Sequence, residues 1–85
     1  VPFGQVVERG MIKPGDMLYD GKRRHSAKVR SDGTLVVNDA SGSIHQMGAQ
    51  VQGAQACNGW TFWNVERKGE LTSIDVFRQE IRAEL

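Results

Sequence analysis

The sequence lacks three things: a second cysteine, a long apolar run and an excess of charge of one sign. Cys57 has no other cysteine to pair with, which excludes a secreted fold held together by internal disulfides. No apolar run approaches the roughly 20 residues of a membrane-spanning helix, so we expect no membrane partner. The chain begins at Val1 rather than at a methionine, and we expect it to be a fragment of a longer protein.

Because the net charge is small, it does not indicate which kind of partner the protein binds. Eleven Lys and Arg residues nearly balance ten Asp and Glu residues, and the formal net charge is +1. Composition alone therefore does not indicate a nucleic-acid partner. Hydrophobic residues make up 39% and charged residues 25% of the chain, which is typical of a folded globular protein and not of a disordered one. The length of 85 residues predicts one domain, spanning residues 1–85.

The charges are unevenly distributed along the chain. Residues 22–30 contain five basic residues and no acidic one, whereas residues 40–65 contain no Asp, Glu, Lys or Arg at all. The basic residues are Lys22, Arg23, Arg24, Lys28 and Arg30. Two interpretations of this segment stay open: a solvated hairpin face, or a surface that neutralises the phosphates of a nucleic acid.

Apolar spacing in the first half of the chain predicts a helix, a strand and a hairpin. A helix is expected near residues 3–9 and a short strand at residues 17–20. Residues 26–30 and 34–37 are two extended runs around an Asp-Gly turn, which predicts a β-hairpin. Alternation along its first strand places Ala27 and Val29 toward the core, and Lys28 and Arg30 toward solvent or a partner.

The second half predicts a helix, an aromatic strand and a last helix. We expect a helix at residues 44–51 capped by Ser41 or Ser43, and a strand at residues 60–65. In that strand Trp60 and Trp63 would face opposite sides, one buried and one outward. A helix from residue 74 to about residue 84, capped at Thr72-Ser73, closes the chain, with a buried stripe predicted at Ile74, Phe77, Ile81 and Leu85. The fold class is α+β: one small domain in which an antiparallel sheet packs against short helices and a C-terminal helix.

Motifs for catalysis or metal binding are missing. The sequence has no CxxC pair, no HExxH and no glycine signature of a phosphate-binding loop. His25 and His45 match no zinc spacing, and we expect no metal site. Cys57 would be a nucleophile only beside an activating base, and a structural thiol is the favoured interpretation.

Three features carry both a structural and a binding interpretation. Gly42-Ser43 lies where a helix begins, so it is either a plain N-cap or a phosphate contact through backbone N–H groups and the hydroxyl. Asn58-Gly59 is either a tight turn or part of a contact surface beside Trp60, which either packs in the core or stacks on an unpaired base. Arg23 and Arg24 have the fork geometry for phosphate or guanine edges.

Ten short stretches, spread over nearly the whole chain, form a recognisable pattern. They are Pro2–Gly4, Val7–Gly10, Ile12–Gly15, Ala27–Arg30, Asp32–Gly33, Gly42–His45, Gly48–Gly53, Cys57–Trp63, Ile74–Asp75 and Arg78–Gln79. The most specific is Asn58-Gly59-Trp60 followed by a second tryptophan. On these residues the chain resembles the RAMA domain (restriction-enzyme and adenine-methylase associated), and more closely the C-terminal region of bacterial cell-cycle-regulated adenine DNA methyltransferases.

The resemblance implies a parent enzyme that transfers a methyl group from S-adenosylmethionine to adenine in a GANTC-type site. The family's catalytic Asp-Pro-Pro-Tyr and cofactor-binding Phe-x-Gly-x-Gly motifs do not occur in this sequence, so no catalytic residue and no cofactor are expected in this domain. Ser43 and Trp60 match positions at which the family contacts DNA. We extend the predicted DNA-binding set to their surroundings and to the basic segment: Arg23, Arg24, Lys28, Arg30, Gly42, His45 and Asn58.

Two hypotheses of different classes follow. In the first, the domain is a non-catalytic DNA-binding module that helps the methyltransferase hold its substrate. In the second, it is a protein–protein module for dimerisation or for docking on the catalytic domain. The resemblance implies DNA, the catalytic domain of the parent chain and a second copy of the enzyme as partners. It also implies a place in the bacterial cytoplasm at the nucleoid, and a part in DNA replication and the cell cycle.

Overall fold

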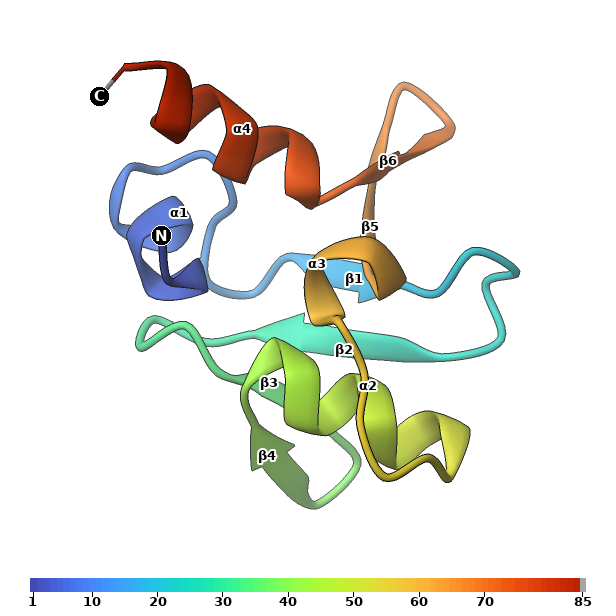
Figure 1. The fold of residues 1–85 in the computed structure, drawn as a ribbon. Coiled ribbons are helices and arrows are strands. Elements are labelled where there is room, and N and C mark those ends of the chain that lie inside the picture. The colour runs from blue at the N-terminus through green and yellow to red at the C-terminus, as the bar shows by residue number, and fades with distance from the viewer. Residues whose placement is uncertain (85) are drawn as a thin grey trace.

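The computed structural model describes residues 1–84 of the chain. These residues are built around one antiparallel sheet of six strands (Figure 1). Its strand order is β4-β3-β2-β1-β5-β6. The strands are β1 Met17–Tyr19, β2 Ser26–Val29, β3 Leu35–Val37, β4 Ala40–Gly42, β5 Asn64–Arg67 and β6 Glu70–Ser73. Every neighbouring pair is antiparallel, as the hairpin pattern predicts.

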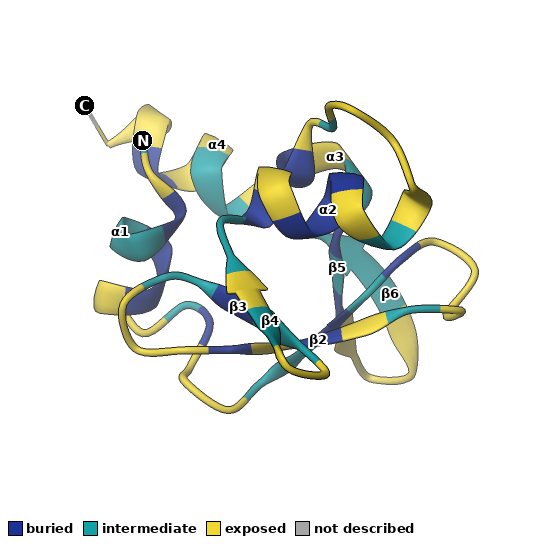
Figure 2. Cartoon of the chain, turned by 90° about the horizontal axis from the view of Figure 1, so that it is seen from below, coloured by how far each residue is buried: buried dark blue, intermediate teal, exposed yellow. Residues whose placement is uncertain are grey.

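Four short helices pack on this sheet. They are α1 Phe3–Glu8, α2 Ile44–Gln52, α3 Gly59–Phe62 and α4 Asp75–Ala83. Helix α2 lies against β3 and β4, α3 lies against α2 and β6, and α1 packs beside α4. Figure 2 shows α2 and α3 together on one side of the strands. The predicted α+β class is confirmed.

The register of the strands places one apolar row against the helices. Leu18 pairs with Ala27 on β2 and with Val65 on β5, while Val29 pairs with Leu35. All five are at most 3% exposed. Burial contributes about 25 cal/mol for each Å² of apolar surface removed from water, so this row stabilises the packing of the sheet in the core.

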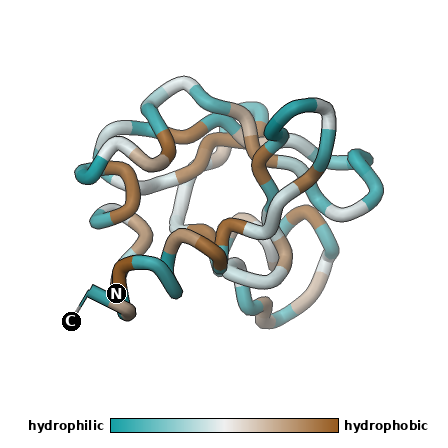
Figure 3. The backbone as a smooth tube through the Cα atoms, turned by 90° about the horizontal axis from the view of Figure 1, so that it is seen from above, coloured by the Kyte–Doolittle hydropathy of each residue, from teal (hydrophilic) through white to brown (hydrophobic). Residues whose placement is uncertain are grey.

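The opposite side of β2 faces outward, as predicted. Lys28 is exposed and pairs with Met17 and Val36, both half-buried. Arg30 follows the strand and is exposed. Hydrophobic residues occur along the chain as short stretches between hydrophilic ones (Figure 3), and within residues 1–84 no helix is long and apolar enough to cross a membrane.

The predicted aromatic strand at residues 60–65 is wrong. Residues 59–62 form α3, and β5 begins only at Asn64. The Asn58 side chain accepts a hydrogen bond from Trp60 N at 3.1 Å and thereby caps the turn. This cap, together with the close packing of Gly59 on Ile44, outweighs the strand preference of the aromatic residues. The expectation of one outward tryptophan fails with it, because Trp60 is 5% and Trp63 0% exposed.

Two short strands were also missed. Ala40–Gly42 forms β4 and Glu70–Ser73 forms β6, although no strand was predicted at either place. Thr72-Ser73 therefore ends a strand, and the N-cap position of α4 is Ile74. Ser73 still contributes to the start of the helix as predicted, because its Oγ accepts a hydrogen bond from Asp75 N at 3.3 Å. Ile74 and Ile81 are fully buried and Phe77 is half-buried, whereas Leu85 lies outside the described residues.

Candidate nucleic-acid interface

Ser43 begins α2 at the end of the sheet where the β2–β3 hairpin turns. Gln46 N donates to Ser43 Oγ at 3.0 Å, and Ser43 N donates to Gln46 Oε1 at 2.9 Å. This reciprocal capping box confirms Ser43 as the N-cap. Within residues 1–84 the Ser43 hydroxyl donates no hydrogen bond, so its proton is available to a ligand.

A single hydrogen bond joins α2 to the segment that carries the second half of the predicted site. Gly59 N donates to His45 Nδ1 at 2.9 Å. The backbones touch here, because a Cβ on Gly59 would lie 2.5 Å from the Ile44 carbonyl carbon. Trp63 Nε1 also donates to Ile44 O at 2.9 Å. The starts of α2 and α3 are therefore held together although they are far apart in the chain.

Trp60 is a core residue with charged and aromatic neighbours. Its ring meets Phe3 edge-on, with ring centroids 5.8 Å apart, and the Arg78 guanidinium lies 5.0 Å from the ring centroid. At 5% exposure, the ring offers no free face on which a base could stack. Trp60 thus contributes to the site as a core residue that packs below it.

A cavity of about 330 Å³ opens where these segments meet. Four segments line it: the start of α1, the tip of the β2–β3 hairpin, the start of α2, and α3. Its lining includes three residues of the predicted set, namely Ser43, His45 and Trp60. Asn58 and Gly42 adjoin these residues in the chain, so five of the nine predicted positions gather here, and Arg30 at the hairpin tip is a sixth.

The hairpin tip adds one charge of each sign to the same end. The Thr34 hydroxyl and backbone N–H both donate to Asp32 Oδ1, at 2.6 and 3.0 Å. These two bonds, and to a smaller extent the nearby Arg30, hold the pKa of Asp32 below its usual value. Arg30 N donates to Thr34 O at 2.9 Å, which places Arg30 beside the residues that line the cavity.

The remaining basic residues lie elsewhere. Arg23 and Arg24 belong to the β1–β2 turn at the opposite end of β2. Arg23 is already engaged: it pairs with Glu66 at 3.2 Å and lies over the Tyr19 ring. Lys28 projects from the outer side of the sheet. The structure therefore does not join the basic segment and the Ser43 region into one surface, and only Arg30 lies at the Ser43 end.

Arg78 is a residue of this region that the sequence interpretation missed. Its Nη2 atom lies 2.5 Å from Asp75 Oδ1, and its guanidinium packs on Trp60. An acidic and a basic residue three positions apart in a predicted helix are a readable signal for such a pair. Asp75 and Arg78 thus link α4 to the segment that begins with Asn58.

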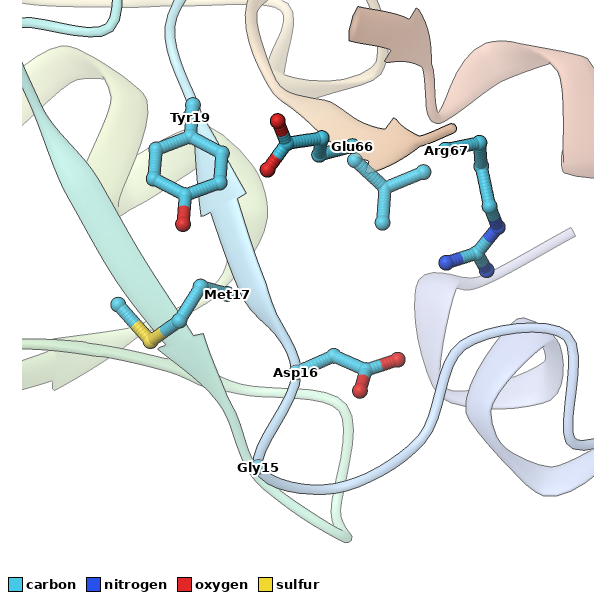
Figure 4. A pocket seen from close by; sticks show the side chains of 7 residues that line it. Gly15, Asp16, Met17, Tyr19, Glu66 and Arg67 are labelled. Carbon is cyan, nitrogen blue, oxygen red and sulfur yellow. The ribbon is translucent and has the colours of Figure 1, made fainter. Parts of the chain in front are cut away.

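A second cavity, of about 300 Å³, is lined by residues of β1, of β5 and of the loop before β1 (Figure 4). Its charged side chains already have partners. Asp16 accepts from Lys13 N at 2.9 Å, and Arg67 donates to Met11 O at 2.9 Å. Glu66 is the partner of Arg23. Within residues 1–84 no three potential metal ligands cluster, in this cavity or elsewhere.

Comparison with known proteins adds two findings. The sequence matches the Restriction Enzyme Adenine Methylase Associated family, RAMA, over residues 1–85. It is also 28% identical over 80 residues to the Type II methyltransferase M.HinfI of Haemophilus influenzae. The aligned region covers 94% of this chain but 22% of that protein, so the chain spans about a fifth of the length of this curated relative.

Proposed function

Because the chain belongs to the RAMA family of adenine-methylase-associated domains, we propose that it is a non-catalytic DNA-binding domain of an adenine-specific DNA methyltransferase. The observation that carries the proposal is the junction of α2 and α3. The Gly59–His45 hydrogen bond brings Ser43 and Asn58 to one end of the sheet, where exposed polar groups surround a cavity. We call this junction, with Arg30 beside it, the α2–α3 surface.

Phosphate oxygens are the acceptors that this surface suits best. The first turn of α2 contains no acidic residue, so its N-terminal dipole is not neutralised. The Ser43 hydroxyl offers a proton, and Arg30 offers a positive charge at the hairpin tip. The exposed Arg24 and Lys28 are further proposed contacts for DNA that extends beyond this end of the sheet.

The proposal is tested by titrating a fluorescently labelled duplex with the 85-residue chain at several salt concentrations. Phosphate neutralisation releases counterions, so the affinity is expected to fall as salt rises, with a log–log slope of about −0.9 for each phosphate contact. An affinity that does not depend on salt, or no binding at low salt, would contradict the proposal.

S-adenosylmethionine is the cofactor that the family implies for the whole enzyme, and the Phe-x-Gly-x-Gly motif that binds it in the family does not occur in this sequence. We therefore assign cofactor binding and methyl transfer at GANTC-type sites to another part of the parent enzyme, which we place in the bacterial cytoplasm.

One observation favours a second role for the domain, in contact with protein. The outer side of the sheet carries half-buried Met17, Tyr19 and Val36 around the exposed Lys28. Such a mixed strip suits docking on a catalytic domain or on a second copy. Light scattering of the isolated chain tests the second possibility: a stable dimer together with no shift of DNA in a gel would favour the protein-contact role over DNA binding.

A further inference from the structure

Of the two ring nitrogens of His45, Nδ1 is the one that makes a hydrogen bond within residues 1–84. Its Nδ1 atom accepts the hydrogen bond from Gly59 N at 2.9 Å. A ring nitrogen that accepts an N–H bond carries no proton, and in a neutral imidazole the proton then sits on the other nitrogen, Nε2. His45 is exposed and lines the cavity of the α2–α3 surface, so the Nε2–H group lies on the side of the ring away from Gly59.

From this geometry we infer that His45 is held as the neutral Nε2–H tautomer and donates one hydrogen bond to an oxygen of bound DNA. It acts as a directed donor and not as a cation. The DNA part of this inference rests on the proposed function, whereas the tautomer does not. The acceptor is a phosphate oxygen or a base carbonyl oxygen, which present the same lone-pair chemistry to an N–H group.

The surroundings of Gly59 explain why the tautomer is fixed. Gly59 is buried, and its N–H is among the first of α3, which have no partner within their own helix. A buried N–H without an acceptor costs about 1–3 kcal/mol. The close packing on Ile44 and the Trp63 Nε1 bond to Ile44 O hold the segment in place. Protonation of Nδ1 would remove the lone pair that Gly59 N–H needs.

The other ionisable side chain lining this cavity is Asp32, on the hairpin tip. The starts of α1 and α3 contribute none to the lining, and Cys57 precedes α3. Because Thr34 holds the pKa of Asp32 below its usual value, this carboxylate is ionised at neutral pH. A phosphate deep in the cavity would be repelled by it, so the phosphate that His45 would meet lies at the rim.

The tautomer can be read directly by NMR of the 15N-labelled chain. Long-range 1H–15N correlations of the imidazole at pH 7.5 should show a protonated Nε2 and an unprotonated Nδ1. A ring protonated on Nδ1 at pH 7.5 would overturn the inference.

Two isosteric variants separate the two sides of the ring. In His45→Asn the amide oxygen takes the place of Nδ1 and keeps the Gly59 bond, but the outer donor is lost. In His45→Gln the amide reaches the place of Nε2 and keeps a donor, but the Gly59 acceptor is lost. We expect His45→Asn to bind the labelled duplex roughly two- to twelvefold more weakly, the range for one hydrogen bond, with unchanged exchange of the Gly59 amide.

The salt dependence decides between a donor and a cation. His45→Asn should leave the salt slope unchanged, since no charge is removed, whereas a slope smaller by about one unit would mean that His45 neutralises a phosphate. Wild-type affinity in His45→Asn would also overturn the donor role. For His45→Gln we expect faster exchange of the Gly59 amide, and unchanged exchange would overturn the link between the helices.

A duplex with methylphosphonate linkages identifies the source of the oxygen. If His45 meets a phosphate, the penalty of His45→Asn should disappear when that phosphate is replaced, and if it meets a base the penalty should persist. Should the wild-type chain bind no duplex at all, the proposed function fails and the donor role fails with it. The NMR measurement then still decides whether His45 links α2 and α3 as the neutral tautomer.

Discussion

At the scale of the residue, Ser43 has two tasks that the usual alanine substitution cannot separate. Its Oγ accepts the Gln46 N–H that caps α2, and we propose its hydroxyl as a hydrogen-bond donor to DNA. Replacing a Ser cap by Ala costs about 1 kcal/mol of stability, so weakened DNA binding in Ser43→Ala could arise from either task. A substitution that keeps the cap and changes only the charge is needed.

Ser43→Asp is that substitution. Asp caps helices as well as Ser does, and its charge suits the N-terminus of α2. We expect unfolding in urea to differ from wild type by less than about 0.5 kcal/mol. Duplex affinity should fall at least tenfold, because the carboxylate repels phosphate. Ser43→Thr is the matched control and should bind within about threefold of wild type. A Ser43→Asp chain that binds like wild type would remove Ser43 from the interface.

Trp60 is a poor probe of DNA binding, because it is buried and its substitution changes stability. Truncation of a buried Trp to Ala costs about 3–5 kcal/mol, a large part of the 5–15 kcal/mol that stabilises a typical domain. We therefore predict that Trp60→Ala unfolds much of the population at 37 °C, as followed by circular dichroism. Trp60→Phe keeps an aromatic ring beside Phe3 and should retain DNA binding. A stable, folded Trp60→Ala chain that no longer binds would show direct contact instead.

At the scale of the element, apolar periodicity predicted helices α1, α2 and α4 and the β2–β3 hairpin, but not α3 in the aromatic segment. Asn58 can cap a turn or sit in one, and the sequence does not say which. The choice is made by the close approach of Gly59 to Ile44, a tertiary contact that no local pattern reveals. Strands β4 and β6 were missed because they are short edge strands, whose pairing depends on their neighbours more than on their own residues.

Gly59→Ala tests this account of α3. The added Cβ would lie 2.5 Å from the carbonyl carbon of Ile44, and this neighbour is backbone that cannot rotate away. We expect destabilisation of roughly 1–3 kcal/mol, the range for overpacking, measured by urea unfolding, with loss of the His45 contact. Gly21→Ala is the control, since Gly21 has nothing within 4 Å of an added Cβ. Equal stabilities of the two variants would contradict the packing of α3 on α2.

At the scale of the whole molecule, the basic residues that lie close together in segment 22–30 of the sequence do not form one charged surface in the fold. Strand β2 extends through the basic segment, so Arg24 and Arg30 lie at its two ends. Four residues at about 3.3 Å each separate these ends by roughly 13 Å. The sequence predicted the residues of the α2–α3 surface, through the pattern around Ser43 and Trp60. It did not predict which arginine accompanies them, because that depends on the sheet register.

The salt slope of DNA binding should therefore differ between single arginine variants. Arg30→Ala removes a charge at the α2–α3 surface and should lower the slope by about one unit. Arg23→Ala removes a guanidinium that already pairs with Glu66 and donates to Gly69 O, so its slope should stay within error of wild type. Titrations of one duplex at several salt concentrations measure both. If Arg23→Ala lowers the slope as much as Arg30→Ala does, the DNA runs along the β1–β2 turn, and the α2–α3 surface is not its main contact.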